Sequence, residues 1–338
     1  MMQHSPPQQP PDDHHIHWLW FLGYVLLYLL CIFFPALVAE SYWNVIFFPL
    51  VFLTALIVYL VYNTYIRHNV RYSHMYFADL FRGFSHSFFG GGFFALLTEL
   101  WVTTVFLLIV LLIFGPSRAL TAIQNESFAD EAASYTCNNV GVHLYLAFTS
   151  FCVAGFIEEA SKAYLLQYVT KLYLPHTIHL RPVHQDYHRF VWLGLCVGLG
   201  FGSVEGVLYV CLYGATAGFA GQFILWLIRA FIAIPFHTIT GFLWGVHLSK
   251  RECHKVPQYT WLKMGYQQIL LHGLYDFIEM EIALDLVCAS ATTWLQILLS
   301  IGIAIAYTVG SAVFAWYQYR KVLREQENNN DHQLIDGE

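Results

Sequence analysis

Residues 190–213 read FVWLGLCVGLGFGSVEGVLYVCLY, an apolar run whose one charged residue is Glu205. The run exceeds the ~20 residues with which an α-helix crosses a bilayer. A carboxylate inside hydrocarbon is costly, so such a group usually faces the interior of a helix bundle and serves function. The stretch therefore predicts a membrane-spanning helix that carries part of a buried polar site.

The composition extends this interpretation to the whole chain of 338 residues, which is 57% hydrophobic and 11% charged. A soluble domain carries roughly 25% charged residues. Seven more apolar runs lie at 18–39, 43–62, 88–114, 140–172, 219–248, 266–286 and 292–316. We therefore predict an all-α bundle of about eight transmembrane helices over residues 17–320, surrounded by lipid, with no nucleic-acid partner. Residues 1–16 and 321–338 are polar and predict tails.

The basic residues predict the orientation of the bundle. With eight spans, 13 of the 16 Lys and Arg residues fall in loops or tails on the same side of the membrane. Such a bias marks the cytoplasmic side, so both termini are expected in the cytoplasm, in an endomembrane or the plasma membrane. The glycosylation sequon at Asn125 lies in a loop on the opposite side.

Four ionisable motifs occur on four consecutive predicted spans. They are Glu158-Glu159-x-x-Lys162, Phe201-x-x-x-Glu205, His237-x-x-x-Gly241 and His272-x-x-x-Asp276. Their ionisable groups are 9 to 16 residues from the nearest cytoplasmic basic residue, or about 14–24 Å at ~1.5 Å per residue. Because all of them share one depth, we expect them to surround one cavity.

Helical spacing suggests roles within this layer. Glu158 and Lys162 are four residues apart and stack on one helix face, so Lys162 can neutralise one glutamate while its neighbour stays available as a base. His272 and Asp276 have the same spacing, which suits two ligands of one metal or a carboxylate that orients an imidazole. Phe201 lies one turn before Glu205 and is expected to line the site. Each motif alone also fits a structural ion pair or a hydrogen bond between helices.

Other polar and small residues in the spans receive structural interpretations. Arg229 falls toward the exoplasmic half and is interpreted as a structural or interfacial charge. Glu99 lies outside the four motifs, and His143 lies too near the exoplasmic end to join them. Gly198 belongs to a glycine-rich stretch that lets neighbouring spans approach closely.

The ordered set of motifs resembles the PrsW-type intramembrane protease family, which shares a superfamily with the CAAX prenyl endopeptidases. The resemblance covers roughly residues 150–280. The CAAX branch typically has His where Glu205 stands and Asn where Gly241 stands, so these residues favour the PrsW-like branch.

The resemblance implies an intramembrane endopeptidase that cleaves membrane-anchored protein substrates. Glu158 and Glu159 match the paired glutamates, one of which would activate water, with Lys162 and Glu205 beside them. His237, His272 and Asp276 would bind a metal, for which zinc is expected. The chain has no HExxH motif, so water activation by glutamate and histidine without a metal stays open.

Two other classes of function use the same buried groups. The superfamily also resembles the Aph subunit of gamma-secretase, so a non-catalytic scaffold or chaperone is one alternative, and it predicts a fully paired cluster. A proton-coupled transporter is the other, because buried acids, Lys and His form proton relays. The oligomeric state does not follow from the sequence.

Overall fold

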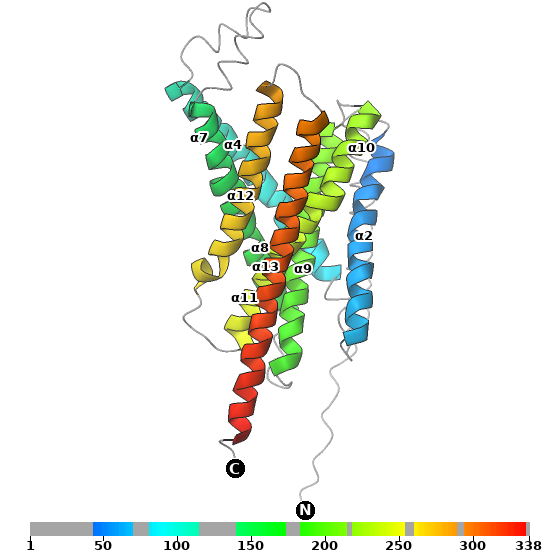
Figure 1. Cartoon of the computed structure of the whole chain (residues 1–338), viewed down its shortest axis with the longest axis vertical. Coiled ribbons are helices and arrows are strands. Elements are labelled where there is room, and N and C mark those ends of the chain that lie inside the picture. The colour runs from blue at the N-terminus through cyan, green and yellow to red at the C-terminus, as the bar shows by residue number, and fades with distance from the viewer. Residues whose placement is uncertain are drawn as a thin grey trace, which may run out of the picture.

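The computed structural model describes residues 43–69, 81–114, 140–173, 183–214, 218–253, 260–288 and 294–335. Within these ranges every regular element is a helix, and the long helices run side by side along the long axis of the molecule (Figure 1). The fold class is therefore all-α. The predictions for the N-terminal tail, the first span and Asn125 lie outside the described residues.

The helices often contain a wider π-helical turn. The α-helices are α2 (Asn44–Asn69), α4 (Phe93–Phe114), α7 (Val140–Phe148), α8 (Glu159–Tyr173), α9 (Val183–Val207), α10 (Gly218–Ile228), α11 (Ile234–Cys253), α12 (Trp261–Cys288) and α13 (Trp294–Ile335). The π-helical turns are Ser87–Gly92, Thr149–Glu158, Leu208–Tyr213 and Arg229–Ala233. Such turns are frequent at functional sites, and two of these begin or end at a charged residue, Arg229 or Glu158.

Five helical stretches among the described residues are long and apolar enough to cross a membrane. They are Phe81–Phe106, Val140–Lys171, Tyr187–Cys211, Gly218–Cys253 and Trp294–Glu325. They correspond to five of the predicted spans, and the chain is a multi-pass membrane protein. The predicted spans 43–62 and 266–286 are the helices α2 and α12, so the total of eight stays a prediction.

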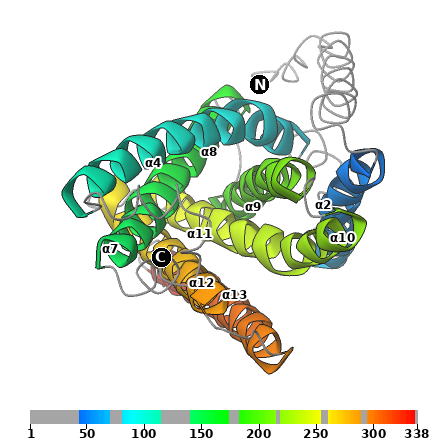
Figure 2. The same cartoon turned by 90° about the horizontal axis from the view of Figure 1, so that it is seen from above.

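Helix α9 forms the centre of the bundle. Seen from above, it lies inside a ring of helices that includes α2, α4, α8 and α11 (Figure 2). In the most apolar part of its span 94% of the residues are buried, whereas in the corresponding part of α13 17% of the residues are buried. Apolar side chains that point outward belong against lipid. Glu205 in the apolar part of α9 is therefore placed in the interior.

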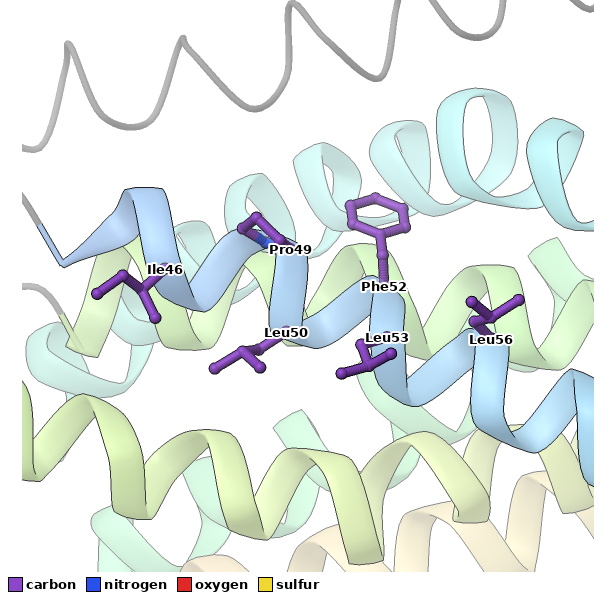
Figure 3. Close-up of a pocket in the computed structure, with 6 residues that line it drawn as sticks. All are labelled: Ile46, Pro49, Leu50, Phe52, Leu53 and Leu56. Atoms are coloured by element: carbon purple, nitrogen blue, oxygen red, sulfur yellow. The ribbon is translucent and has the colours of Figure 1, made fainter.

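The outer face of α2 also suits a lipid environment. A groove of about 630 Å³ follows this helix and is lined only by apolar side chains (Figure 3). Leu53 and Leu56 line it and are about half exposed. Its six lining residues are Ile46, Pro49, Leu50, Phe52, Leu53 and Leu56.

Helix α13 extends past the predicted boundary of the C-terminal tail and reaches Ile335. Val322 is buried against Tyr187 and Val246. Lys250 Nζ at the end of α11 lies 2.8 Å from Glu325 Oε2. The start of the polar segment is thus packed against the bundle.

Glycines hold α9 and α11 in close contact. A Cβ atom built on Gly198 would lie 2.2 Å from the carbonyl oxygen of His237, and one on Gly241 would lie 2.4 Å from that of Gly194. Real Cβ atoms do not approach backbone atoms so closely. The glycine of the His-x-x-x-Gly motif therefore sets the separation of two helices that carry site residues.

We expect Gly241→Ala to destabilise the protein by about 1–3 kcal/mol, the usual cost of overpacking, because backbone cannot rotate away from the new methyl group. Thermal unfolding in detergent measures the effect. Gly302→Ala in α13 is the matched control, since a Cβ there meets nothing within 4 Å. Equal melting temperatures for the two variants would show that the close packing of α9 and α11 does not contribute to thermal stability.

Candidate functional site

The predicted motif residues come together in the interior, at the meeting point of α8, α9, α11 and α12. The π-helical turn Thr149–Glu158 ends where α8 begins, and the paired glutamates occupy this junction. Six of the motif residues are at least 93% buried: Glu158, Glu159, Lys162, Glu205, His237 and His272. A side-chain cluster with so little exposure in a membrane protein must satisfy its charges internally.

Glu159 has partners on both carboxylate oxygens. Its Oε1 lies 2.6 Å from Lys162 Nζ and 2.7 Å from His272 Nδ1, and its Oε2 accepts a hydrogen bond of 2.8 Å from Trp244 Nε1. A carboxylate only accepts, so Nδ1 of His272 carries a proton, and in the neutral ring Nε2 keeps its lone pair. Glu159 is thus the glutamate that Lys162 neutralises, and it fixes the orientation of His272.

Trp244 is a site residue that the sequence analysis did not identify. We expect Trp244→Phe, which removes the indole donor to Glu159, to lower activity about 10- to 100-fold, the usual effect of losing a group that orients a ligand. Cleavage of a membrane-anchored reporter measures it. Trp316→Phe in α13 is the control, because that residue is 46% exposed. Wild-type activity in Trp244→Phe would show that the hydrogen bond from the indole to Glu159 does not contribute to catalysis.

His237 is held from two sides. Its Nε2 contacts Glu205 Oε2, and its Nδ1 lies 2.9 Å from Lys162 Nζ. An ammonium group only donates, so Nδ1 is the acceptor and Nε2 carries the proton beside the carboxylate. Phe201 lines the site beside His237 and Lys162, as predicted. Its ring centre lies 5.6 Å from that of His237 and 4.7 Å from Lys162 Nζ.

Glu158 faces the nitrogen of each histidine that does not contact Glu159 or Glu205. Its Oε2 lies 3.7 Å from His237 Nδ1 and 3.6 Å from His272 Nε2. This oxygen is buried and makes no hydrogen bond within the described part of the chain. A buried polar atom without a partner is costly, so this carboxylate is placed for something other than internal pairing.

The donor atoms fit a metal ion. One ligand atom each from Glu158, His237 and His272 lies within 4.8 Å of the other two. Zinc bonds of ~2.0–2.1 Å in a tetrahedral site separate ligand atoms by roughly 3.3 Å, close to the spacing between Glu158 Oε2 and the two nitrogens. In each histidine the other ring nitrogen meets a carboxylate, which is the usual support for a metal ligand.

Lys162 is close enough to compete with a cation at these donors. Its Nζ lies 3.8 Å from Glu158 Oε2 as well as near His237 Nδ1. The ammonium group also has Glu159 and Thr240 Oγ1 as partners, the latter at 3.3 Å. A bound metal would therefore leave Lys162 with two oxygen partners.

Asp276 stands at the edge of the cluster. Its Oδ2 lies 3.5 Å from His272 Nε2, and its side chain is 21% exposed. The predicted stacking of these two residues is therefore present. Asp276 shares the same imidazole nitrogen with Glu158, so it can serve as another oxygen donor or receive a proton there.

Arg229, interpreted from the sequence as a structural or interfacial charge, lies beside the motif residues. Its Nη2 lies 2.6 Å from Glu205 Oε2, inside the cluster. Straight α-helical counting did not show this because the π-helical turn Arg229–Ala233 separates it from His237 and changes the angular spacing. The sequence signal available was an arginine in the same span as a motif histidine.

Glu99 of α4 is a second acid that lies against the motifs. Its carboxyl group interacts electrostatically with that of Glu158, and its Oε1 is buried without a hydrogen-bond partner among the described residues. Carboxylates therefore outnumber the basic groups Lys162 and Arg229 at the site, and a divalent cation would reduce this excess. His143, as expected, does not join the cluster; its Nδ1 lies 3.0 Å from Glu281.

A multi-pass helical protein with a buried centre of carboxylates, lysine and histidines defines the class of candidate intramembrane hydrolases. A family model described as PrsW family intramembrane metalloprotease matches residues 100–309. This match covers more than half of the chain, so the protein belongs to that family, and the predicted resemblance is confirmed. All four motifs fall within the matched residues, whereas Glu99 falls just outside them.

Three curated relatives match part of the chain, and each is called Protease PrsW. The one from Bacillus subtilis (strain 168) is 32% identical over 134 residues, which is 39% of this chain and 54% of the relative. Those from Clostridioides difficile (strain 630) and Shouchella clausii (strain KSM-K16) are 30% identical over 40% and 43% of this chain and 53% and 60% of their own length. The matches thus span little more than half of these relatives. No solved structure matches the chain.

Proposed function

We propose that the protein is an intramembrane endopeptidase that hydrolyses peptide bonds of membrane-anchored proteins. The observation that carries this proposal is the convergence of Glu158 Oε2 with His237 Nδ1 and His272 Nε2 inside a membrane bundle. Family membership supports the reaction class. Peptide hydrolysis needs an activated water, a base and stabilisation of the developing oxyanion.

His237 and His272 would hold a metal through those nitrogens, with Asp276 as an oxygen donor within reach. Imidazole and carboxylate donors are typical of catalytic zinc, so we propose zinc. When bound, such an ion makes water a stronger nucleophile near neutral pH and polarises the substrate carbonyl. Glu205 and Glu159 would keep the two imidazole rings in orientation.

Glu158 is the proposed base. It is the member of the glutamate pair whose Oε2 is not used in internal hydrogen bonds within the described residues, whereas both oxygens of Glu159 are occupied. Its carboxylate would take the proton from the attacking water and pass it to the leaving amine. The Lys162 ammonium supplies positive charge on the same side, where it can stabilise an oxyanion.

The cluster is also distinct from what a scaffold would need. A scaffold predicts that every buried polar atom is paired, yet Glu158 Oε2 and Glu99 Oε1 make no hydrogen bond in the described part of the chain. We further propose that both termini face the cytoplasm, supported by the distribution of Lys and Arg in the sequence.

Purified protein in liposomes, loaded with zinc, tests the function on a panel of single-span reporter proteins. Mass spectrometry of the products identifies any cleaved bond. We expect cleavage within or next to the span of at least one reporter. Capture of reporters without cleavage of any, by folded protein with zinc bound, would instead support a scaffold and contradict the proposal.

A further inference from the structure

Arg229 is a guanidinium placed inside a candidate membrane span. It begins the π-helical turn between α10 and α11, within Gly218–Cys253, and its side chain is 11% exposed. A charged residue at such a position is costly and usually faces a partner in the bundle interior. Its contacts therefore indicate what it does.

Two groups of α9 and the following π-helical turn hold the guanidinium in place. Nη2 lies 2.6 Å from Glu205 Oε2, and the guanidinium carbon lies 4.5 Å from the ring centre of Tyr209. Tyr209 is four residues after Glu205, so a single helix face presents the carboxylate and the aromatic ring. The planar guanidinium suits this combination of ion pair and stacking.

The same Glu205 oxygen also contacts Nε2 of His237. Arg229, Glu205 and His237 thus form a chain of contacts that ends at the imidazole whose Nδ1 faces Glu158. A carboxylate held by two partners has little freedom to rotate. The orientation and tautomer of His237 therefore depend on groups that hold Glu205.

We propose that Arg229 is a positioning residue that acts through Glu205 to hold His237 Nδ1 toward the metal-binding donors. This inference rests on the proposed function, since it assigns Arg229 a part in the same site. A simpler role would be to neutralise buried Glu205 so that the bundle folds. The two roles differ in whether the arginine affects metal binding once the fold is intact.

A double-variant cycle of Arg229→Met and Glu205→Gln distinguishes the positioning role of Arg229 from charge neutralisation. Zinc affinity is measured by competition with a fluorescent chelator, and the cobalt-substituted protein gives an absorption spectrum that reports ligand geometry. Thermal unfolding of the same samples reports the fold. We expect each single variant to bind zinc about 10- to 100-fold more weakly, as for other groups that orient ligands, with an altered cobalt spectrum.

In the double variant the buried charges are balanced again, so thermal stability should recover relative to Arg229→Met. Zinc affinity should stay at the level of Glu205→Gln, because Arg229 acts only through Glu205 and coupled residues are not additive. Recovery of wild-type zinc affinity together with stability would overturn the proposal in favour of charge balance. Losses of zinc affinity that add fully in the double variant would also overturn the proposal, because Arg229 would then act independently of Glu205.

Arg251→Met is the matched control. Arg251 Nη2 also lies 2.6 Å from a glutamate oxygen, that of Glu252, and its guanidinium carbon lies 4.7 Å from the ring centre of Trp261. This arginine is outside the site, so zinc affinity and the cobalt spectrum should match wild type.

Arg229→Lys keeps a cation in the span. This variant replaces Arg229→Met in the zinc measurements if Arg229→Met yields no folded protein. We expect its zinc affinity to lie between those of wild type and Glu205→Gln. Wild-type affinity and spectrum in every folded Arg229 variant would overturn the inference. Failure of the wild-type protein itself to bind zinc or cobalt would contradict the proposed metal site instead, so the two failures are distinguishable.

Discussion

Glu158→Gln is expected to abolish cleavage of a single-span reporter while zinc binding stays within a few-fold of wild type. Glutamine keeps the volume and a carbonyl oxygen but cannot take the proton from water. Losing a catalytic base typically costs 10²–10⁴-fold in rate. Reporter cleavage in liposomes and zinc stoichiometry on the same sample measure both effects.

Glu281→Gln is the control for this change. Glu281 is also a carboxylate beside an imidazole, since both of its oxygens lie 3.0 Å from His143 Nδ1, but it is outside the cluster. Its cleavage rate should stay near that of wild type. If Glu158→Gln released zinc, Glu158 would be a metal ligand rather than the base, and full activity in that variant would reject both roles.

His272→Ala is expected to lose both zinc and turnover. The substitution removes the Nε2 donor near Glu158 and Asp276 and leaves Glu159 without one of its hydrogen-bond partners. Stability should also fall by about 1–3 kcal/mol, because a buried polar group loses its partner. Zinc content, cleavage and thermal unfolding of the purified variant give the three readouts.

His247→Ala separates loss of stability from loss of metal. His247 is buried on α11, and its Nδ1 lies 2.7 Å from the carbonyl oxygen of Met264, outside the cluster. We expect this variant to melt earlier but to keep its zinc and most of its cleavage activity. Zinc retention by His272→Ala would be incompatible with the proposed donor set.

The convergence of the motif residues could be predicted because charge in a membrane span has few stable positions. Glu205 in an otherwise apolar run and the His272–Asp276 pair at helical spacing both had to face the interior. Their common depth followed from counting residues along straight helices. The same counting does not identify which glutamate Lys162 neutralises, because that depends on His272 and Trp244 from other helices.

The supporting residues could not be predicted from one sequence. Trp244 looks like an ordinary core residue until Glu159 lies beside it. Glu99 belongs to a helix without a motif, and its approach to Glu158 is a matter of tertiary packing. The contact of Arg229 with Glu205 was not predicted because a π-helical turn lies between Arg229 and His237. These three contacts were missed for the same reason, because the periodicity of a single helix does not determine which residues of other helices it contacts.

Zinc removal and restoration is the most direct test of the claim that a buried glutamate–histidine centre hydrolyses peptide bonds with a metal. Wild-type protein in liposomes is stripped with a chelator, and its cleavage of a single-span reporter is followed as zinc is added back. We predict that cleavage is lost with the metal and returns fully at one zinc per chain. Undiminished cleavage by protein shown to be free of metal would contradict the account.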